Sequence, residues 1–201
     1  MEFMLISESF RNKGMIPARY TCDGWDMSPP LFWTLPPERT KSLVLIVDDP
    51  DAPDPDAPKT TWVHWLLYNI PPDADGLPEG AAPKDLPRGT LQGKNDWGRS
   101  GYGGPCPPHG THRYRHTLYA LDTLLPDLDY PDRTTLEKVM QGHVIAQSEL
   151  TGMYQRSTPD SGREAGAKES TREARGNPWP SSVSIWARPI RRRPSCATAG
   201  R

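Results

Sequence analysis

The sequence predicts a mainly β fold, in which antiparallel strands are followed by one helical segment near the C-terminal end of the folded unit. Two observations support this order. Short runs of β-branched and aromatic residues come first, and the stretch with helical periodicity comes last. A hydrophobic fraction of 35% and 24 prolines further indicate short strands joined by stiff loops, rather than a helix bundle.

Three segments are predicted to be strands. Residues 42–47 (SLVLIV) form an apolar run that stops at a turn-forming cluster of Asp and Pro. Residues 62–70 (WVHWLLYNI) form a second run, which ends at two prolines. Residues 113–121 form a third run, rich in Tyr and Leu. The intervening stretch 89–110 contains too many glycines and prolines for regular structure.

Residues 134–154 are predicted to be helical. Thr134 and Glu137 have the spacing of a capping box, in which each side chain accepts a hydrogen bond from a backbone amide of the first turn. Gly142 could divide the stretch into two helices. Apolar residues then recur at helical spacing, at Leu136, Val139, Met140 and Val144.

The distribution of charge divides the chain at residue 156. Residues 1–156 contain 15 Lys and Arg against 21 Asp and Glu, whereas residues 157–201 contain 9 against 4. The second segment has no sustained periodicity and cannot bury enough apolar surface to offset the entropy of ordering. We therefore expect a folded domain at 1–156 and a basic, disordered tail at 157–201, whose removal should leave the melting temperature nearly unchanged.

Composition also excludes some functions. A formal net charge of −1 gives no reason to expect a nucleic-acid partner, and no segment has the character of a targeting peptide or a membrane span. Three cysteines in a chain with no visible export signal indicate reduced thiols and a cytoplasmic location. A disulfide between Cys22 and Cys106 is the alternative.

Chemically useful side chains are found in pairs at or beside the ends of the predicted strands: Asp49 with Asp51, Trp62 with His64, and His112 with Tyr114. Histidine and tyrosine can both donate hydrogen bonds to an oxyanion, and a neighbouring carboxylate favours the charged form of an imidazole. Glycines in the loop 101–110 allow backbone amides to approach a ligand. Taken alone, however, a strand histidine is more often a packed structural residue.

The order of several short motifs resembles the phosphatidylethanolamine-binding (Raf kinase inhibitor-like) protein family, and its bacterial branch in particular. The resemblance spans residues 3–156, and several motifs in the same order are far more specific than any one of them. The matching segments are IPARYTCDG at 16–24, SPPL at 28–31, DPDAP at 49–53, WVH at 62–64, GPCPP at 104–108, HRY at 112–114 and GH at 142–143.

The resemblance implies two antiparallel sheets and a small pocket that takes phosphate, acetate or a phospholipid headgroup. Asp49 and His64 would form the polar centre of this pocket, Tyr114 would donate its hydroxyl to the anion, and Trp62 would form a wall. Asp51, Cys106 and Arg113 match the motifs but could serve the structure of the loops instead. The full set of implied ligand-binding residues is Asp49, Pro53, Trp62, His64, Gly104, Pro105, His112 and Tyr114.

These observations favour a regulatory binding protein that recognises phosphorylated groups, without a metal or cofactor. A zwitterion such as phosphoethanolamine would place its phosphate on a charged His64 and on Tyr114. Two alternatives are a protease-inhibitor-like protein acting through surface loops and a hydrolase that uses Asp49, His64 and His112. No catalytic motif supports the hydrolase, so we expect no enzymatic activity. A kinase or protease partner and a homodimer are both compatible with the sequence.

Overall fold

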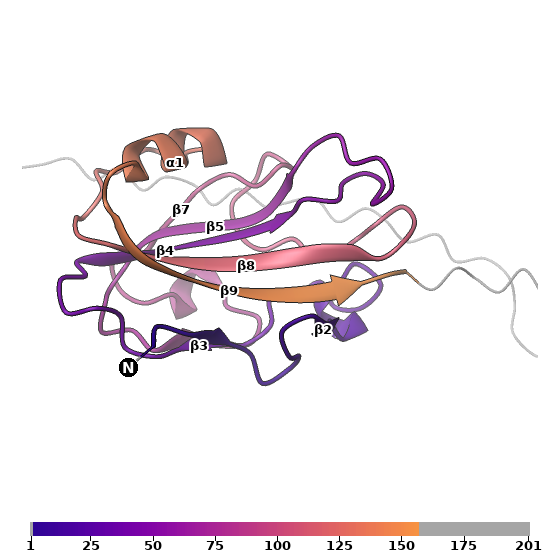
Figure 1. The fold of residues 1–201 in the computed structure, drawn as a ribbon, viewed down its shortest axis with the longest axis horizontal. Helices are drawn as coiled ribbons and strands as arrows, with labels where there is room; N and C mark the ends of the chain where they lie inside the picture. The colour runs from indigo at the N-terminus through magenta and orange to yellow at the C-terminus, as the bar shows by residue number, and fades with distance from the viewer. Residues whose placement is uncertain (1, 157–201) are drawn as a thin grey trace, which may run out of the picture. The chain divides into compact units, whose positions relative to one another are not determined.

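The computed structural model describes residues 2–156, which fall within one compact unit, Met1–Asp160. The expected tail at 157–201 lies outside the described residues. Nine strands form two sheets, and Figure 1 shows the larger sheet running across the middle of the domain. This architecture confirms the expected mainly β fold.

The larger sheet has six strands in the order β2, β9, β8, β4, β5, β7, and the smaller sheet has the order β1, β3, β6. All neighbouring strands are antiparallel except β2 and β9, which are parallel. The strands are β1 (Leu5–Ile6), β2 (Gly14–Met15), β3 (Leu31–Trp33), β4 (Ser42–Asp49), β5 (Trp62–Ile70), β6 (Gly76–Leu77), β7 (Leu91–Gln92), β8 (His112–Leu121) and β9 (Val144–Tyr154). The helices are α1 (Arg133–Met140) and the short 3₁₀ turns η1 (Ala18–Tyr20) and η2 (Pro83–Asp85).

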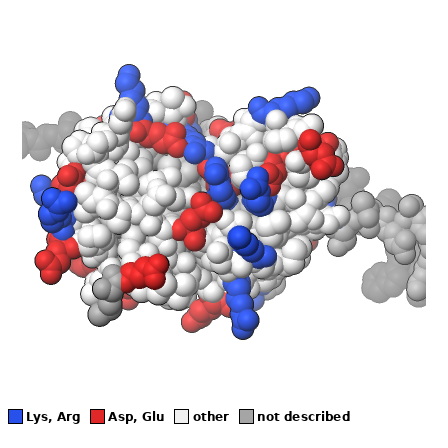
Figure 2. Space-filling model, viewed as in Figure 1, with Lys and Arg blue, Asp and Glu red and all other residues white. Residues whose placement is uncertain are grey.

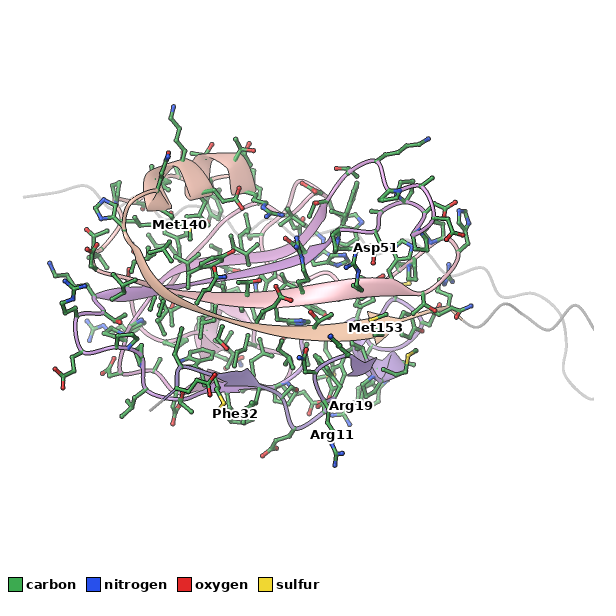
Figure 3. The ribbon with its side chains drawn as sticks, viewed as in Figure 1. Arg11, Arg19, Phe32, Asp51, Met140 and Met153 are labelled. Atoms are coloured by element: carbon green, nitrogen blue, oxygen red, sulfur yellow. A yellow bond between two sulfur atoms is a disulfide. The ribbon has the colours of Figure 1, made fainter. Side chains whose placement is uncertain are left out.

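Each face of the larger sheet covers its own hydrophobic core. On one face, the small sheet packs Leu31 and Trp33 against Leu45 and Val47 of β4. On the other face, helix α1 packs against Val44, Ile46 and their neighbours. Figure 3 shows Met140 between the helix and the sheet. Strand β4 is buried on both faces, so its sequence is a nearly continuous run of apolar residues. This run is the pattern that predicted the strand.

The helical prediction was correct only for its first third. Helix α1 ends at Met140, Gly142 adopts a left-handed φ of 83°, and residues 144–154 form strand β9. This strand pairs with β8 along nearly its whole length, so cross-strand hydrogen bonds outweigh the helical spacing of Val144. The N-cap was also misplaced. It is Asp132, whose carboxylate accepts a hydrogen bond from the Thr135 amide at 2.8 Å, rather than Thr134.

The other strand predictions were close. Strand β5 matches the expected residues 62–70, β4 continues two residues beyond Val47, and β8 begins at His112 rather than at 113. The two-residue strand β7 lies within the glycine-rich stretch expected to be irregular, and the short strands of the small sheet were not predicted. Two- and three-residue strands carry too few residues for a periodic pattern.

Acidic and basic side chains are mixed over the face shown in Figure 2, without a broad patch of one sign. One charged cluster has a structural role: the buried Asp48 pairs with Arg115 of β8 and with Arg133 of α1, at 2.7 and 2.6 Å. This cluster ties the helix to the sheet. Within residues 2–156, no helix has both the length and the apolar character that a membrane crossing would need.

Candidate ligand-binding pocket

A cavity of about 280 Å³ lies at one end of the larger sheet, where β4 ends and where β5 and β8 begin. The strand ends bring together Asp49, His64 and Tyr114, which are far apart in the sequence, as the family resemblance requires. The loop after β4 and the loop before β8 complete the walls. The lining residues are Asp49, Ala52, Pro53, Trp62, His64, Trp97, Cys106, Pro107, Pro108, His112 and Tyr114.

A β-bulge in β5 turns His64 towards this cavity. Val47 of β4 pairs with Trp65, but the next residue, Asp48, pairs with Val63, so His64 is an extra residue without a partner on β4. A bulge places two successive side chains on the same side of the sheet. Here it leaves Trp65 in the hydrophobic core while the adjacent His64 lines the cavity.

The glycine-rich loop is held by hydrogen bonds that use its own amides. The Gly103 amide donates to the carbonyl of His64 at 3.1 Å, and the Gly104 amide donates to Asp26 Oδ1 at 2.6 Å. The carbonyl of Pro105 accepts from the Cys22 amide. Gly104 also packs so tightly against the backbone of residues 20 and 21 that a Cβ there would clash. These two glycine amides therefore shape the loop and are not free to bind an anion, contrary to the expectation.

A disulfide joins Cys22 to Cys106, with the two Cα atoms 5.4 Å apart. The two thiols are therefore not reduced, contrary to the expectation. The hydrogen bond between the Cys22 amide and the Pro105 carbonyl holds the two loops together, which places the cysteines within bonding distance. Both cysteines are exposed to solvent, and Cys106 is part of the cavity wall. Because the two cysteines are bonded, they no longer support a cytoplasmic location. The sulfur of Cys106 is also not available as a thiolate nucleophile.

Asp49 pairs with His112 rather than with His64. Asp49 Oδ2 lies 2.7 Å from His112 Nδ1, and its Oδ1 accepts a hydrogen bond from the Asp51 amide at 2.8 Å. Burial raises the pKa of Asp49, against the lowering effect of its hydrogen bond with His112. The second nitrogen of His112, Nε2, lies 3.1 Å from the carbonyl of His109.

The partners of His112 determine the number of protons that the pair holds. A carbonyl oxygen only accepts, so Nε2 must carry a proton, and a second proton must lie between Nδ1 and the carboxylate. The pair is then either imidazolium with carboxylate or neutral imidazole with carboxylic acid. Its net charge is zero in both cases, so it adds no net positive charge to the cavity.

His64 is neutral, contrary to the expectation of a charged imidazole. Its Nδ1 lies 2.6 Å from the carbonyl of Gly103, to which it must donate. Burial, opposed only in part by this hydrogen bond, lowers its pKa from 6.5 to about 4. At neutral pH the other nitrogen, Nε2, therefore has a free lone pair. Nε2 has no hydrogen-bond partner among the described residues and, unlike Nε2 of His116, is not sealed from solvent.

Tyr114 is part of the cavity wall, and its hydroxyl is sealed from solvent. The residue is 1% exposed, and its hydroxyl has no hydrogen-bond partner within residues 2–156. Burial raises the pKa of Tyr114, so the hydroxyl remains protonated and able to donate. A buried hydroxyl without a partner costs about 1–3 kcal/mol, and such a group requires an explanation.

Aromatic rings and prolines form the rest of the wall. The ring of Trp97 lies edge-on to Trp62 and to His64, with centroids 5.5 and 5.1 Å apart, and Tyr114 lies edge-on to His64 at 5.2 Å. Trp97 is 44% exposed and was not predicted as a site residue. Its only sequence signal was an isolated tryptophan in a glycine-rich stretch.

Six of the eight expected residues line the cavity, and two do not. Gly104 and Pro105 lie behind the wall, where they fix the loop against residues 20–26. Asp51, for which two roles were open, accepts from both the backbone and the guanidinium of Arg113, at 2.8 and 2.6 Å, which lowers its pKa. It therefore serves the loop, and Figure 3 shows it beside the start of β8. Within 2–156, no three His, Cys, Asp or Glu residues are arranged to hold a metal ion.

Comparisons with known proteins agree with this geometry. The family model described as phosphatidylethanolamine-binding protein matches residues 6–155. A UPF0098 protein of the archaeon Methanothermobacter thermautotrophicus is 48% identical over 153 residues, covering 76% of this chain and 98% of that protein. Another UPF0098 protein, from Aquifex aeolicus, is 45% identical over 157 residues, covering 76% and 88%.

Two crystal structures show the same fold. A phosphatidylethanolamine-binding protein homologue, CT736 of Chlamydia trachomatis, is 41% identical with a TM-score of 0.71, covering 77% of this chain and 98% of its own. YbcL of E. coli, described as a new member of the mammalian PEBP family, is 33% identical with a TM-score of 0.71, covering 78% and 100%.

Proposed function

This chain belongs to the phosphatidylethanolamine-binding protein family, and on that premise we propose that its cavity binds a small anion, such as the phosphorylated end of a lipid headgroup. The protein would act as a regulatory binding protein and not as an enzyme. One observation carries the proposal: His64 lines the cavity together with Asp49, His112 and Tyr114, and its Nε2 has no hydrogen-bond partner among the described residues.

The size and the lining of the cavity support a small ligand. A volume of about 280 Å³ lies at the lower end of the range for small-molecule sites, which begins at roughly 300 Å³. The cavity is lined by a few polar side chains among many apolar ones, which is the usual composition of a small-molecule site. The polar atoms orient the ligand, and the apolar walls exclude water. Phosphate, acetate or phosphoethanolamine is of suitable size.

The same geometry disfavours turnover. Both nitrogens of His112 are engaged, Asp49 is paired with it, and the sulfur of Cys106 is in a disulfide. The hydrolase alternative would need an activated nucleophile beside a general base, and none of these groups supplies one. Binding without chemistry is therefore the function we propose.

A regulatory role requires a second molecule that responds to the occupied pocket. Because Trp97 is part of the cavity wall and also 44% exposed, a bound ligand could change the surface that a partner contacts. A kinase or a protease is the class of partner that the family suggests. Inhibition of a protease through the surface loops remains the alternative.

Isothermal calorimetry with phosphate, phosphoethanolamine and choline tests the proposal. We expect both phosphate compounds to bind weakly, because a small ligand buries little surface, and choline not to bind. At 100 times its dissociation constant, a ligand stabilises the fold by about 2.7 kcal/mol, which a melting experiment detects. Binding of choline without binding of either phosphate compound would contradict an anion site.

A further inference from the structure

We infer that the disulfide between Cys22 and Cys106 is a redox-controlled clasp on the cavity wall. When a thiol reductant opens it, residues 106–111 are released and the cavity loses affinity for its ligand. The release depends only on how this loop is attached, whereas the change in affinity rests on the proposed function. The clasp regulates the cavity without taking part in the recognition of the ligand.

The disulfide joins two exposed residues at the edge of the cavity. Both Cys22 and Cys106 are exposed, and Cys106 is also one of the lining residues. Thiol–disulfide exchange requires a thiolate to reach one of the two sulfurs, so a bond between exposed residues reacts without unfolding of the domain. Exposed disulfides are the labile and regulatory ones, whereas buried structural disulfides resist reduction.

The turn that carries Cys22 is held by contacts that do not involve the disulfide. The carboxylate of Asp23, the next residue, accepts hydrogen bonds from the Tyr154 hydroxyl at 2.8 Å and from Nε of Arg156 at 3.0 Å. The hydrogen bonds from Arg156 and Tyr154 lower the pKa of Asp23, so the carboxylate stays ionised and keeps both partners near neutral pH. Cys22 therefore stays in place when the disulfide opens.

The loop is also held immediately before Cys106. Residues 103–105 are hydrogen-bonded to His64, to Asp26 and to the Cys22 amide. Opening the disulfide breaks none of these hydrogen bonds. The release is therefore confined to the C-terminal side of Cys106.

The segment that follows has few other attachments. In the described part of the chain, residues 106–111 make no backbone–backbone hydrogen bond, and regular pairing resumes only at His112, where β8 begins. The side-chain polar contacts of His109 and Thr111 are at exposed positions, where such contacts contribute little to stability. The disulfide is therefore the main anchor of this segment at its N-terminal end.

Release of the segment changes the cavity in two ways. Pro107 and Pro108 line the cavity, so part of its wall loses a fixed position. The carbonyl of His109 accepts from Nε2 of His112, so the pair of His112 with Asp49 loses one of its fixed partners. A ligand must then order the segment again when it binds, which lowers its affinity.

The opening takes up two electrons, which a dithiol reductant supplies. Its thiolate attacks one sulfur of the disulfide, forming a mixed disulfide and releasing the other cysteine as a thiolate that takes up a proton. The second thiolate of the reductant then attacks the reductant's own sulfur in the mixed disulfide. The second cysteine is released and protonated in the same way, and the reductant leaves as a cyclic disulfide. A disulfide oxidant reverses both steps.

The experiment uses the full chain with Cys196→Ser, which keeps the third cysteine out of the exchange. Oxidised, dithiothreitol-reduced and reoxidised samples are compared well below the melting temperature, and alkylation with mass spectrometry measures the state of the bond. We expect reduction of the native protein, at a rate that low concentrations of denaturant leave unchanged. If the bond is reduced only after the domain unfolds, the inference is wrong.

Backbone order parameters from NMR relaxation measure the release without any ligand. On reduction, the amides of residues 109–111 should fall from about 0.85 to below about 0.6, the range of flexible backbone. Residues 23–26, on the fixed side of the disulfide, are the internal control and should not change. Unchanged values at 109–111, or an equal fall at 23–26, would overturn the inference.

Calorimetry with inorganic phosphate on the same samples measures the effect on binding. We expect the reduced protein to bind about tenfold more weakly than the oxidised protein, and reoxidation to restore the affinity. Adding Cys22→Ser and Cys106→Ser should give weak binding that dithiothreitol does not change. A reductant effect that persists in this variant, or equal affinities in the oxidised and reduced protein, would contradict the clasp.

The proposed function has a different failure, in which phosphate binds to none of the samples. The order parameters then decide alone whether the disulfide holds residues 106–111. If the serine variant does not fold, the cycle of reduction and reoxidation decides the effect on affinity, because it uses the same chain throughout.

Discussion

Asp49 and His112 face each other inside the protein at one end of the larger sheet, with Oδ2 2.7 Å from Nδ1, and the two side chains are 5% and 1% exposed. The carboxylate alone would repel an anion in the adjacent cavity. The carboxylate is paired with His112, whose other nitrogen donates to a carbonyl and so is also protonated. The pair as a whole is therefore uncharged and does not repel an anion. A carboxyl group can therefore lie in the wall of an anion site.

The variant Asp49→Asn tests this neutrality. Its amide oxygen can accept from the Asp51 amide and its NH₂ group can donate to Nδ1 of His112, so each hydrogen bond has a replacement. Because the pair was already neutral, we expect the affinity for phosphate to change less than about threefold, as measured by calorimetry. Asp49→Ala, which leaves His112 and the Asp51 amide unpaired, should instead destabilise the fold by about 2–4 kcal/mol. A large gain in phosphate affinity in Asp49→Asn would show that the carboxylate repels the ligand.

Replacing Tyr114 by phenylalanine should separate binding from stability. The hydroxyl has no hydrogen-bond partner in the described part of the chain, so its loss should leave the free energy of unfolding unchanged or raise it by about 1 kcal/mol. We expect a bound ligand to reach this hydroxyl, which is otherwise sealed from solvent, so phosphate affinity should fall by about five- to fifteenfold, the equivalent of one hydrogen bond.

Tyr68→Phe is the control for that variant. The Tyr68 hydroxyl accepts from the Leu128 amide and donates to Asp127, so its removal should cost about 1 kcal/mol of stability without an effect on phosphate binding. Chemical denaturation and calorimetry on both variants provide the comparison. Equal destabilisation by the two substitutions would mean that the Tyr114 hydroxyl has a structural partner.

Acid should destabilise the protein before its carboxylates titrate. Burial lowers the pKa of both His64 and His116 to about 4, whereas in the unfolded chain they titrate near 6.5. Between these values the unfolded state binds more protons, so stability falls as pH falls. Each histidine should cost up to about 1.4 kcal/mol for each pH unit in this range.

Denaturation curves from pH 7 to pH 5 measure this loss, and His116→Leu isolates one histidine. The leucine cannot titrate, so stability should fall less steeply with pH in this variant, whatever its stability at pH 7. Identical slopes in His116→Leu and the wild type would show that His116 is not buried in its neutral form.

The disulfide should contribute substantially to stability. Cys22 and Cys106 are separated by 84 residues, and closing a loop of this length restricts the unfolded chain. We expect the double variant with serine at both positions to lose about 2–4 kcal/mol, measured by denaturation under oxidising conditions. A reductant should destabilise the wild type by a similar amount and leave the double variant unaffected. If neither treatment changes the stability, the two cysteines are not bonded in the purified protein.

Local patterns, such as the apolar run of β4, were sufficient to predict the long central strands. Most of the pocket was predicted through the family resemblance of the motifs around Asp49, His64 and His112. The sequence could not predict which carboxylate would meet which histidine. Asp49 pairs with His112 of β8 and not with His64 of β5. Distances along the chain do not show which of the two histidines a strand places beside Asp49. The fate of residues 144–154 was equally hidden, because pairing with β8 decides it.

His64 is the extra residue of a bulge, and the stability of the fold does not require a residue at this position. If residue 64 were deleted, Val63 and Trp65 would become neighbours in a regular ladder, each still facing its present side of the sheet. Both hydrophobic cores would be preserved, and the strand would lose only this bulge and the imidazole. Selection or design for stability alone would therefore favour deletion of residue 64. In a designed or evolved variant, an extra residue at this point of β5 would be a direct sign that the pocket had been selected for use.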